Sequence, residues 1–294
     1  MRPNRLLATA LAAAAITLGA AACGGTNTHP APPASTTQPT NTTAPAQPTA
    51  TGSTQMAMPL QAGAENMKVN ITSPANDTKV TGNSITLVVA HSGYTFSCDL
   101  AGKPVEAGEG HYHVLIDKSL VNMYCTPQAV VSMQNVKPGS HTLTVVPAQD
   151  DHAEVSANAV NVTIDYEPSS PLPPITDVSP LGKPSITIVS PKPGATVSGN
   201  FDVVVAVKNF NLSCDLYGKP DVAGYGHWHL NLDSTSGPMM GMGTMAGMSC
   251  ATTFHASTAG LQPGSSHTLI ATLMGNGHAP LEPLVNAQVE VKVK

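Results

Sequence analysis

Two histidine pairs are the residues in this chain whose types and spacing best suit chemistry. His111 and His113 flank a tyrosine, and His227 and His229 flank a tryptophan. In a β-strand, residues two positions apart point to the same face and lie roughly 6.5 to 7 Å apart along the strand. That spacing suits two imidazole ligands on one metal ion. A polar strand face that carries histidines without any metal is the alternative.

Each pair needs a third ligand, and His152 and His278 are the candidates. In an immunoglobulin-like sheet, the strand of each pair lies antiparallel to the strand that precedes the third histidine, so the end of one meets the beginning of the other. We therefore expect one cluster of three imidazoles in each half of the chain: His111, His113 and His152, and His227, His229 and His278. Imidazole suits both zinc and copper, so the metal stays open.

Two further histidines, His141 and His267, are expected to lie outside these clusters. They begin the neighbouring strand, about 16 Å from its other end. We expect them to pair with Asp117 and Asp233 at that end of the sheet.

A glycine-rich insertion before Cys250 holds five of the twelve methionines: Met239, Met240, Met242, Met245 and Met248. Thioethers prefer the soft ion Cu(I), so the insertion is a candidate soft-metal loop and favours copper. An adaptable apolar surface for a partner, or a flexible loop, would explain the same composition.

The chain repeats itself, and this repeat predicts the elements that position the histidines. The segment 97–104 recurs as 213–220, and the Gly-x-Gly-His-x-His and Pro-Gly-Ser motifs follow in the same order in both halves. Short β-type runs and turn signals in each half predict an all-β fold of two tandem immunoglobulin-like antiparallel β-sandwiches after a disordered N-terminal tether. Copy 1 spans 66–166, a proline-rich linker 167–185, and copy 2 spans 186–294.

Alternation along the histidine strands predicts which face each side chain takes. Apolar residues occupy the positions between the histidines and should face the core: Tyr112, Val114 and Ile116 in copy 1, and Trp228, Leu230 and Leu232 in copy 2. The histidines are then expected on the opposite, solvent-exposed face of the sheet.

The cysteines indicate export. Apart from Cys23 there are four, and an even number in an exported chain favours disulfides. Four cysteines allow three connectivities, and the repeat selects one bridge per copy: Cys98–Cys125 and Cys214–Cys250.

The N-terminal sequence predicts the cellular location of the protein. Residues 1–22 have a basic start, an apolar run too short to span a bilayer and a small-residue end, as in a signal peptide. Cys23 follows three alanines and resembles the lipidated cysteine of bacterial lipoproteins; an ordinary secretory signal is the alternative. Residues 23–65 would be the lipidated Cys23 and a disordered Thr/Pro-rich tether. We therefore expect an extracytoplasmic protein, anchored to the bacterial cell membrane through Cys23.

The motifs Gly-x-Gly-His-x-His, Pro-Gly-x-His-Thr-Leu and Gly/Asp-x-His resemble those of an uncharacterised exported His-rich β domain family of bacteria, a domain of unknown function. The resemblance covers both copies, roughly 68–165 and 186–294, and the segment 277–281 carries it better than 151–154. It implies an exported β domain and no established activity.

Composition narrows the function. Only 11% of residues are charged, with a net charge of −5, and both arginines lie within the first five residues. Nucleic acid is therefore not expected as a partner. The motifs typical of hydrolases and phosphate binders are missing from the sequence, so we expect no catalytic residues and no enzyme. We expect a monomeric surface lipoprotein that binds copper or zinc or serves a metal-linked envelope partner; a metal-free structural or adhesive module is the alternative.

Overall fold

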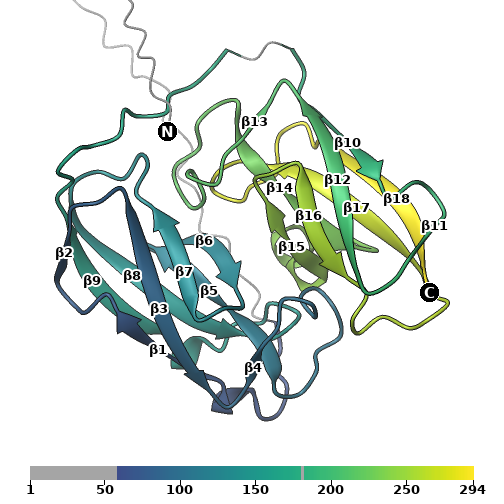
Figure 1. Ribbon diagram of the computed structural model, residues 1–294, viewed down its shortest axis with the longest axis horizontal. Coiled ribbons are helices and arrows are strands. Elements are labelled where there is room, and N and C mark those ends of the chain that lie inside the picture. Colours follow the sequence, from purple (N-terminus) through teal and green to yellow (C-terminus); the bar gives the residue numbers. More distant parts are fainter. Residues whose placement is uncertain (1–57, 180–181) are drawn as a thin grey trace, which may run out of the picture. The chain divides into compact units, whose positions relative to one another are not determined.

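A computed structural model describes residues 58–179 and 182–294. The predicted signal peptide, Cys23 and most of the predicted tether lie outside these residues. The described part of the chain is nearly all β, with the strands of the two copies shown in Figure 1. None of its helices has the length and apolar character needed to cross a membrane.

Copy 1 is a sandwich of two sheets (Figure 1). One sheet has the order β1-β3-β7, formed by Lys68–Ser73, Ser84–Ser92 and Gln128–Ser132. The other has the order β2-β9-β8-β5-β4, formed by Thr78–Val80, Val160–Tyr166, Gly139–Ala148, Glu109–Ile116 and Thr95–Phe96, and β6 (Ser119–Tyr124) also pairs with β5. Short 3-10 turns are η1 (Ala64–Asn66) and η2 (Ser156–Asn158).

Copy 2 repeats this topology strand for strand. Its smaller sheet is β10-β12-β16, formed by Ser185–Ser190, Asn200–Lys208 and Thr253–Ser257. Its larger sheet is β11-β18-β17-β14-β13, formed by Ala195–Val197, Asn286–Val293, Ser266–Met274, Tyr225–Leu232 and Asn211–Leu212, with β15 (Met245–Ser249) beside β14. The short turns α1 (Pro238–Gly241) and η3 (Met242–Thr244) precede β15. The predicted tandem immunoglobulin-like sandwiches are confirmed.

The cores form as the alternation predicts. Tyr112 and Val114 of β5 are fully buried in the core of copy 1, and Trp228 and Leu230 of β14 are fully buried in that of copy 2. Since successive side chains of a strand point to opposite faces, the histidines between them lie on the other face of the larger sheet.

Both disulfides pair as the repeat predicts, Cys98 with Cys125 and Cys214 with Cys250. The strands β4 and β13 are only two residues long, because the chain turns after Phe96 and after Leu212. These turns carry the first cysteine of each bridge. The second cysteine follows β6 or β15 directly, and neither of these edge strands was predicted.

The segments flanking copy 1 pack against it. Ala64, inside the predicted tether, is buried in η1, and Gln61 donates its backbone N–H to the Gln149 side chain (3.1 Å). In the linker, Ile175 exchanges two hydrogen bonds with the Asn135 side chain (2.8 and 2.9 Å). Order therefore extends beyond the two predicted sandwiches.

Candidate metal centres

Two elements of copy 1 bring three histidines together. His111 and His113 lie on β5, where His111 pairs with Ala148 near the end of the antiparallel β8. The chain leaves β8 in a tight turn that places His152 in a left-handed conformation (φ 65°), with its backbone N–H donated to Gln149. The turn folds back over the strand and brings the third imidazole to the pair, as the predicted register requires.

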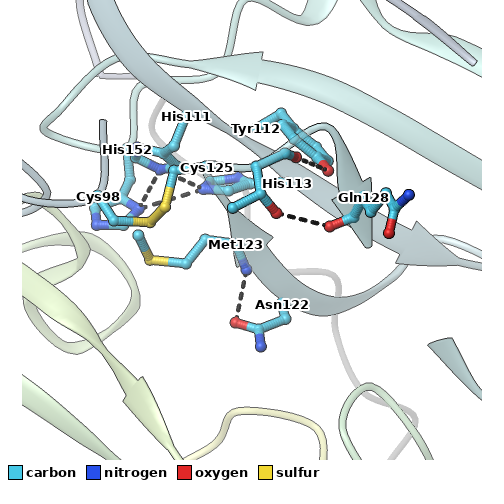
Figure 2. The surroundings of a disulfide bond; sticks show 10 residues. Cys98, His111, Tyr112, His113, Asn122, Met123, Cys125, Gln128 and His152 are labelled. Carbon is cyan, nitrogen blue, oxygen red and sulfur yellow. Dashed lines mark hydrogen bonds between the residues drawn. A yellow bond between two sulfur atoms is a disulfide. The ribbon is translucent and has the colours of Figure 1, made fainter. Parts of the chain in front are cut away.

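The three ring nitrogens form a nearly equilateral triangle, drawn with dashed lines in Figure 2. His111 Nε2 lies 3.1 Å from His113 Nε2 and 3.0 Å from His152 Nδ1, and the third side measures 3.2 Å. Tetrahedral bonds of about 2.0–2.1 Å from a metal ion separate its ligand nitrogens by about 3.3 Å. The triangle therefore has the size of one face of a metal coordination shell.

Hydrogen bonds alone do not explain this triangle. Glu154 Oε1 accepts the Nδ1 proton of His113 (2.7 Å), and the Met245 carbonyl accepts the Nε2 proton of His152 (2.7 Å). A neutral imidazole has one N–H, so His113 Nε2 and His152 Nδ1 face each other with lone pairs. His111 can donate to only one of them, and its Nδ1 is buried without a partner in the described structure. Lone pairs converging in this way are typical of a metal site.

Copy 2 forms the same triangle. His227 Nε2 lies 3.0 Å from both His229 Nε2 and His278 Nδ1, and the third side measures 3.3 Å. His278 occupies a left-handed turn like that of His152 (φ 65°), and His227 Nδ1 is likewise buried without a partner among the described residues. Both triads are thus the residue sets predicted from the sequence, and each could hold one metal ion.

The prediction that these histidines face solvent was wrong. The five ring systems of His111, His113, His152, His227 and His229 are buried, with at most 5% of each residue exposed. Burial disfavours the charged imidazolium, and neighbouring imidazoles add to this. Burial lowers the pKa of His111, His227 and His229 well below the usual value. It lowers the pKa of His152 to about 3 and that of His278 to about 4, so these rings are neutral at neutral pH and can offer lone pairs.

The other copy contributes to the burial of each triad. The sequence pattern within one copy therefore did not predict that these histidines are buried. His152 donates its Nε2 proton to the Met245 carbonyl of β15 (2.7 Å), and His278 donates its own to the Leu120 carbonyl of β6 (2.9 Å). Leu120 and Met245 are equivalent positions, since they pair with the equivalent residues Leu115 and Asn231 of the two histidine strands. Each copy therefore orients the third histidine of the other.

Two equivalent glycines permit this contact. A Cβ on Gly102 would lie 2.5 Å from the backbone of Met245, and a Cβ on Gly218 would lie 2.5 Å from the Leu120 carbonyl oxygen. Both glycines also have a positive φ (72° and 68°). The Gly-Lys-Pro of the repeated segment is thus the point at which each copy approaches the edge strand of the other.

The two sites differ in one outer contact. In copy 1, Glu154 forms an isolated β-bridge with Ala148, and its carboxylate accepts a hydrogen bond from His113. In copy 2, Pro280 takes the corresponding position and forms the isolated β-bridge with Met274. A proline side chain cannot accept a hydrogen bond, so His229 lacks the carboxylate that His113 has.

The predicted pairing of the outlying histidines is confirmed. His141 Nδ1 lies 2.6 Å from Asp117 Oδ2, and His267 Nδ1 lies 2.7 Å from Asp233 Oδ2. The same aspartates accept the backbone N–H of Thr142 and Thr268. These histidines therefore fasten the turn at the far end of the sheet and take no part in the triads.

The methionine insertion packs largely as apolar surface. The side chains of Met242, Met245 and Met248 are buried in the same hydrophobic cluster as the core of copy 1. The partner surface that the composition allowed is thus the other copy of this chain. Metal binding by the insertion remains a prediction.

No family model and no curated protein matches this chain. Solved structures that resemble it include the fibronectin(III)-like modules of Clostridium thermocellum CbhA (12% identity, TM-score 0.24, covering 76% of this chain and 94% of that one). A second is the set of FN1–FN3 domains of chicken CNTN1 (8% identity, TM-score 0.22, covering 75% of this chain and 66% of that one). A third is the BSP domain of a biofilm associated protein (12% identity, TM-score 0.21, covering 77% of this chain and 29% of that one). Likeness at this level carries no functional argument.

Proposed function

We propose that this chain is an exported lipoprotein whose two copies each bind one transition-metal ion, copper or zinc, through three imidazoles. The observation that carries the proposal is the convergence of ring nitrogens at 3.0–3.3 Å in both copies. In copy 1, the acceptors bound by His113 and His152 also leave lone pairs of these two rings facing one another. The signal-like N-terminus, Cys23 and the two disulfides support an extracytoplasmic, membrane-anchored location.

The proposed role is binding and not catalysis. A catalytic zinc site keeps an open coordination position for water or substrate. Here the imidazoles are buried beneath the turn that carries the third histidine and beside the edge strand of the other copy. Such cover suits retention of an ion or its transfer to a partner.

The test measures metal stoichiometry in the untagged, lipid-free chain from residue 24. We expect two equivalents of Cu or Zn per chain, one after changing His111 and His113 to alanine, and none after also changing His227 and His229. The control is His255→Ala, because that side chain is 84% exposed and lies outside both triads. Circular dichroism verifies folding, and single His113→Gln and His229→Gln variants serve if the multiple variants do not fold.

Equal metal binding by the quadruple variant and the wild type would overturn the proposal. So would the lack of binding tighter than micromolar in the folded wild type. Either result would favour the structural or adhesive module that the sequence left as the alternative.

A further inference from the structure

A methionine stands directly across from one histidine of each triad. On β6, Met123 pairs with His113 of β5, and on β15, Met248 pairs with His229 of β14. Directly opposed residues of antiparallel strands project from the same face of the sheet, with Cβ atoms about 4.5–5.5 Å apart. Each triad therefore has a thioether as its neighbour on the next strand.

Comparison of the two copies singles out this methionine. Aligned on their following cysteines, β6 reads Leu-Val-Asn-Met-Tyr and β15 reads Met-Ala-Gly-Met-Ser, so the methionine is the one position that is identical. Both methionines are 9% exposed, so their thioethers are held inside the protein.

The Met123 side chain and the triad of copy 1 both belong to the surroundings of the Cys98–Cys125 bridge (Figure 2). Figure 2 shows the Met123 side chain running from its strand towards the Cys98–Cys125 bridge and the imidazoles of His111, His113 and His152. The bridge fastens the chain two residues beyond Met123. The methionine is thereby held on the strand next to the one that carries His113.

We propose that Met123 and Met248 are the fourth ligands of the two centres and make them selective for Cu(I); this inference rests on the proposed function. Thioether sulfur is a soft donor that favours Cu(I), whereas Zn²⁺ is bound in proteins by imidazole, thiolate and carboxylate. A site of three imidazoles and one thioether would suit copper. Each edge strand thus supplies one soft donor, Met123 on β6 and Met248 on β15. The other methionines of the insertion are not ligands in this proposal.

The test replaces both methionines with leucine, which keeps their volume and apolar packing. Cu(I) affinity is measured under mild reduction by competition with a chromogenic chelator, and Zn²⁺ affinity is measured in parallel. We expect Cu(I) affinity to fall by about tenfold or more, with Zn²⁺ affinity little changed. X-ray absorption of the Cu(I)-loaded wild type should show a sulfur neighbour that the variant lacks.

The matched control is the pair Met133→Leu and Met242→Leu, since both methionines are buried in the same hydrophobic cluster but neither opposes a histidine. Equal Cu(I) affinity in the Met123→Leu/Met248→Leu variant and the wild type, without a sulfur neighbour, would overturn this inference while metal binding by the histidines stood. A wild type that binds neither metal would overturn the inference together with the proposed function.

Discussion

A single residue distinguishes the two otherwise equivalent centres. Glu154 accepts a hydrogen bond from His113 at 2.7 Å and is itself partly exposed. A carboxylate on the second ring nitrogen fixes the tautomer of a ligating histidine and raises its basicity. Because Pro280 takes this place in copy 2, we expect copy 1 to hold its ion more tightly.

Glu154→Gln tests this difference. It keeps a hydrogen-bond acceptor but removes the charge, and loss of such an outer partner costs about 10–100-fold in metal affinity. We expect the affinity of copy 1 to fall by about tenfold at least, towards that of copy 2. Each copy is titrated separately in a background in which the histidine pair of the other copy is changed to alanine.

Copy 2 supplies the control for this prediction. Its affinity should stay the same in the Glu154→Gln variant, since its own third-histidine turn has no carboxylate at that place. An unchanged affinity at copy 1, or an equal loss at both copies, would contradict the assigned role of Glu154.

Residue types and periodicity were enough to predict both triads. His-x-His fixed two imidazoles on one sheet face, and antiparallel pairing placed His152 and His278 at the same end of the sheet. Periodicity did not predict Met123, because β6 is a short edge strand whose Leu-Val-Asn-Met has no clear alternation. Comparing the two copies around their second cysteine was the signal that could have found it.

The edge strands β6 and β15 depend on the disulfides that follow them. Each bridge ties the end of the edge strand to the turn after β4 or β13, closing segments with sequence separations of 27 and 36. Cross-linking loops of this length stabilises a fold by about 3–4 kcal/mol in the chain-entropy description. The strand that carries each methionine is therefore held at the sheet edge by a covalent link.

Replacing Cys98 and Cys125 by serine should release this link in copy 1. We expect the free energy of unfolding to fall by about 3 kcal/mol, measured by denaturant titration. Cu(I) affinity at copy 1 should weaken more than Zn²⁺ affinity, because the thioether is on the freed strand and the imidazoles are not. An unchanged Cu(I) affinity in a variant that remains folded would contradict the link between the bridge and the methionine.

At the scale of the whole molecule, duplication creates sites that neither copy completes alone. The ring N–H of each third histidine is accepted by a carbonyl of the other copy, and methionines of copy 2 share the hydrophobic cluster of copy 1. Burial and His278 lower the pKa of His229, and His152 of the other copy adds to this effect. Patterns within one copy could not predict this contact, because it joins residues about one domain apart in sequence.

Gly102 and Gly218 allow a test of this mutual dependence. An alanine Cβ at either position would lie 2.5 Å from backbone atoms of the other copy, so the copies must shift apart. The carbonyls of Met245 and Leu120 would then move away from His152 and His278. We expect either substitution to weaken metal binding at both centres, by about 10–100-fold where the outer hydrogen bond is lost.

Backbone strain alone must be separated from this effect, because both glycines have a positive φ. Gly108→Ala and Gly264→Ala are the matched controls: their φ values are 82° and 83°, and a Cβ at either position meets nothing within 4 Å. Such strain costs about 1–2 kcal/mol at any of the four positions. Metal affinities at both centres should therefore fall only in the Gly102 and Gly218 variants; equal losses in all four variants would show that each copy holds its ion independently.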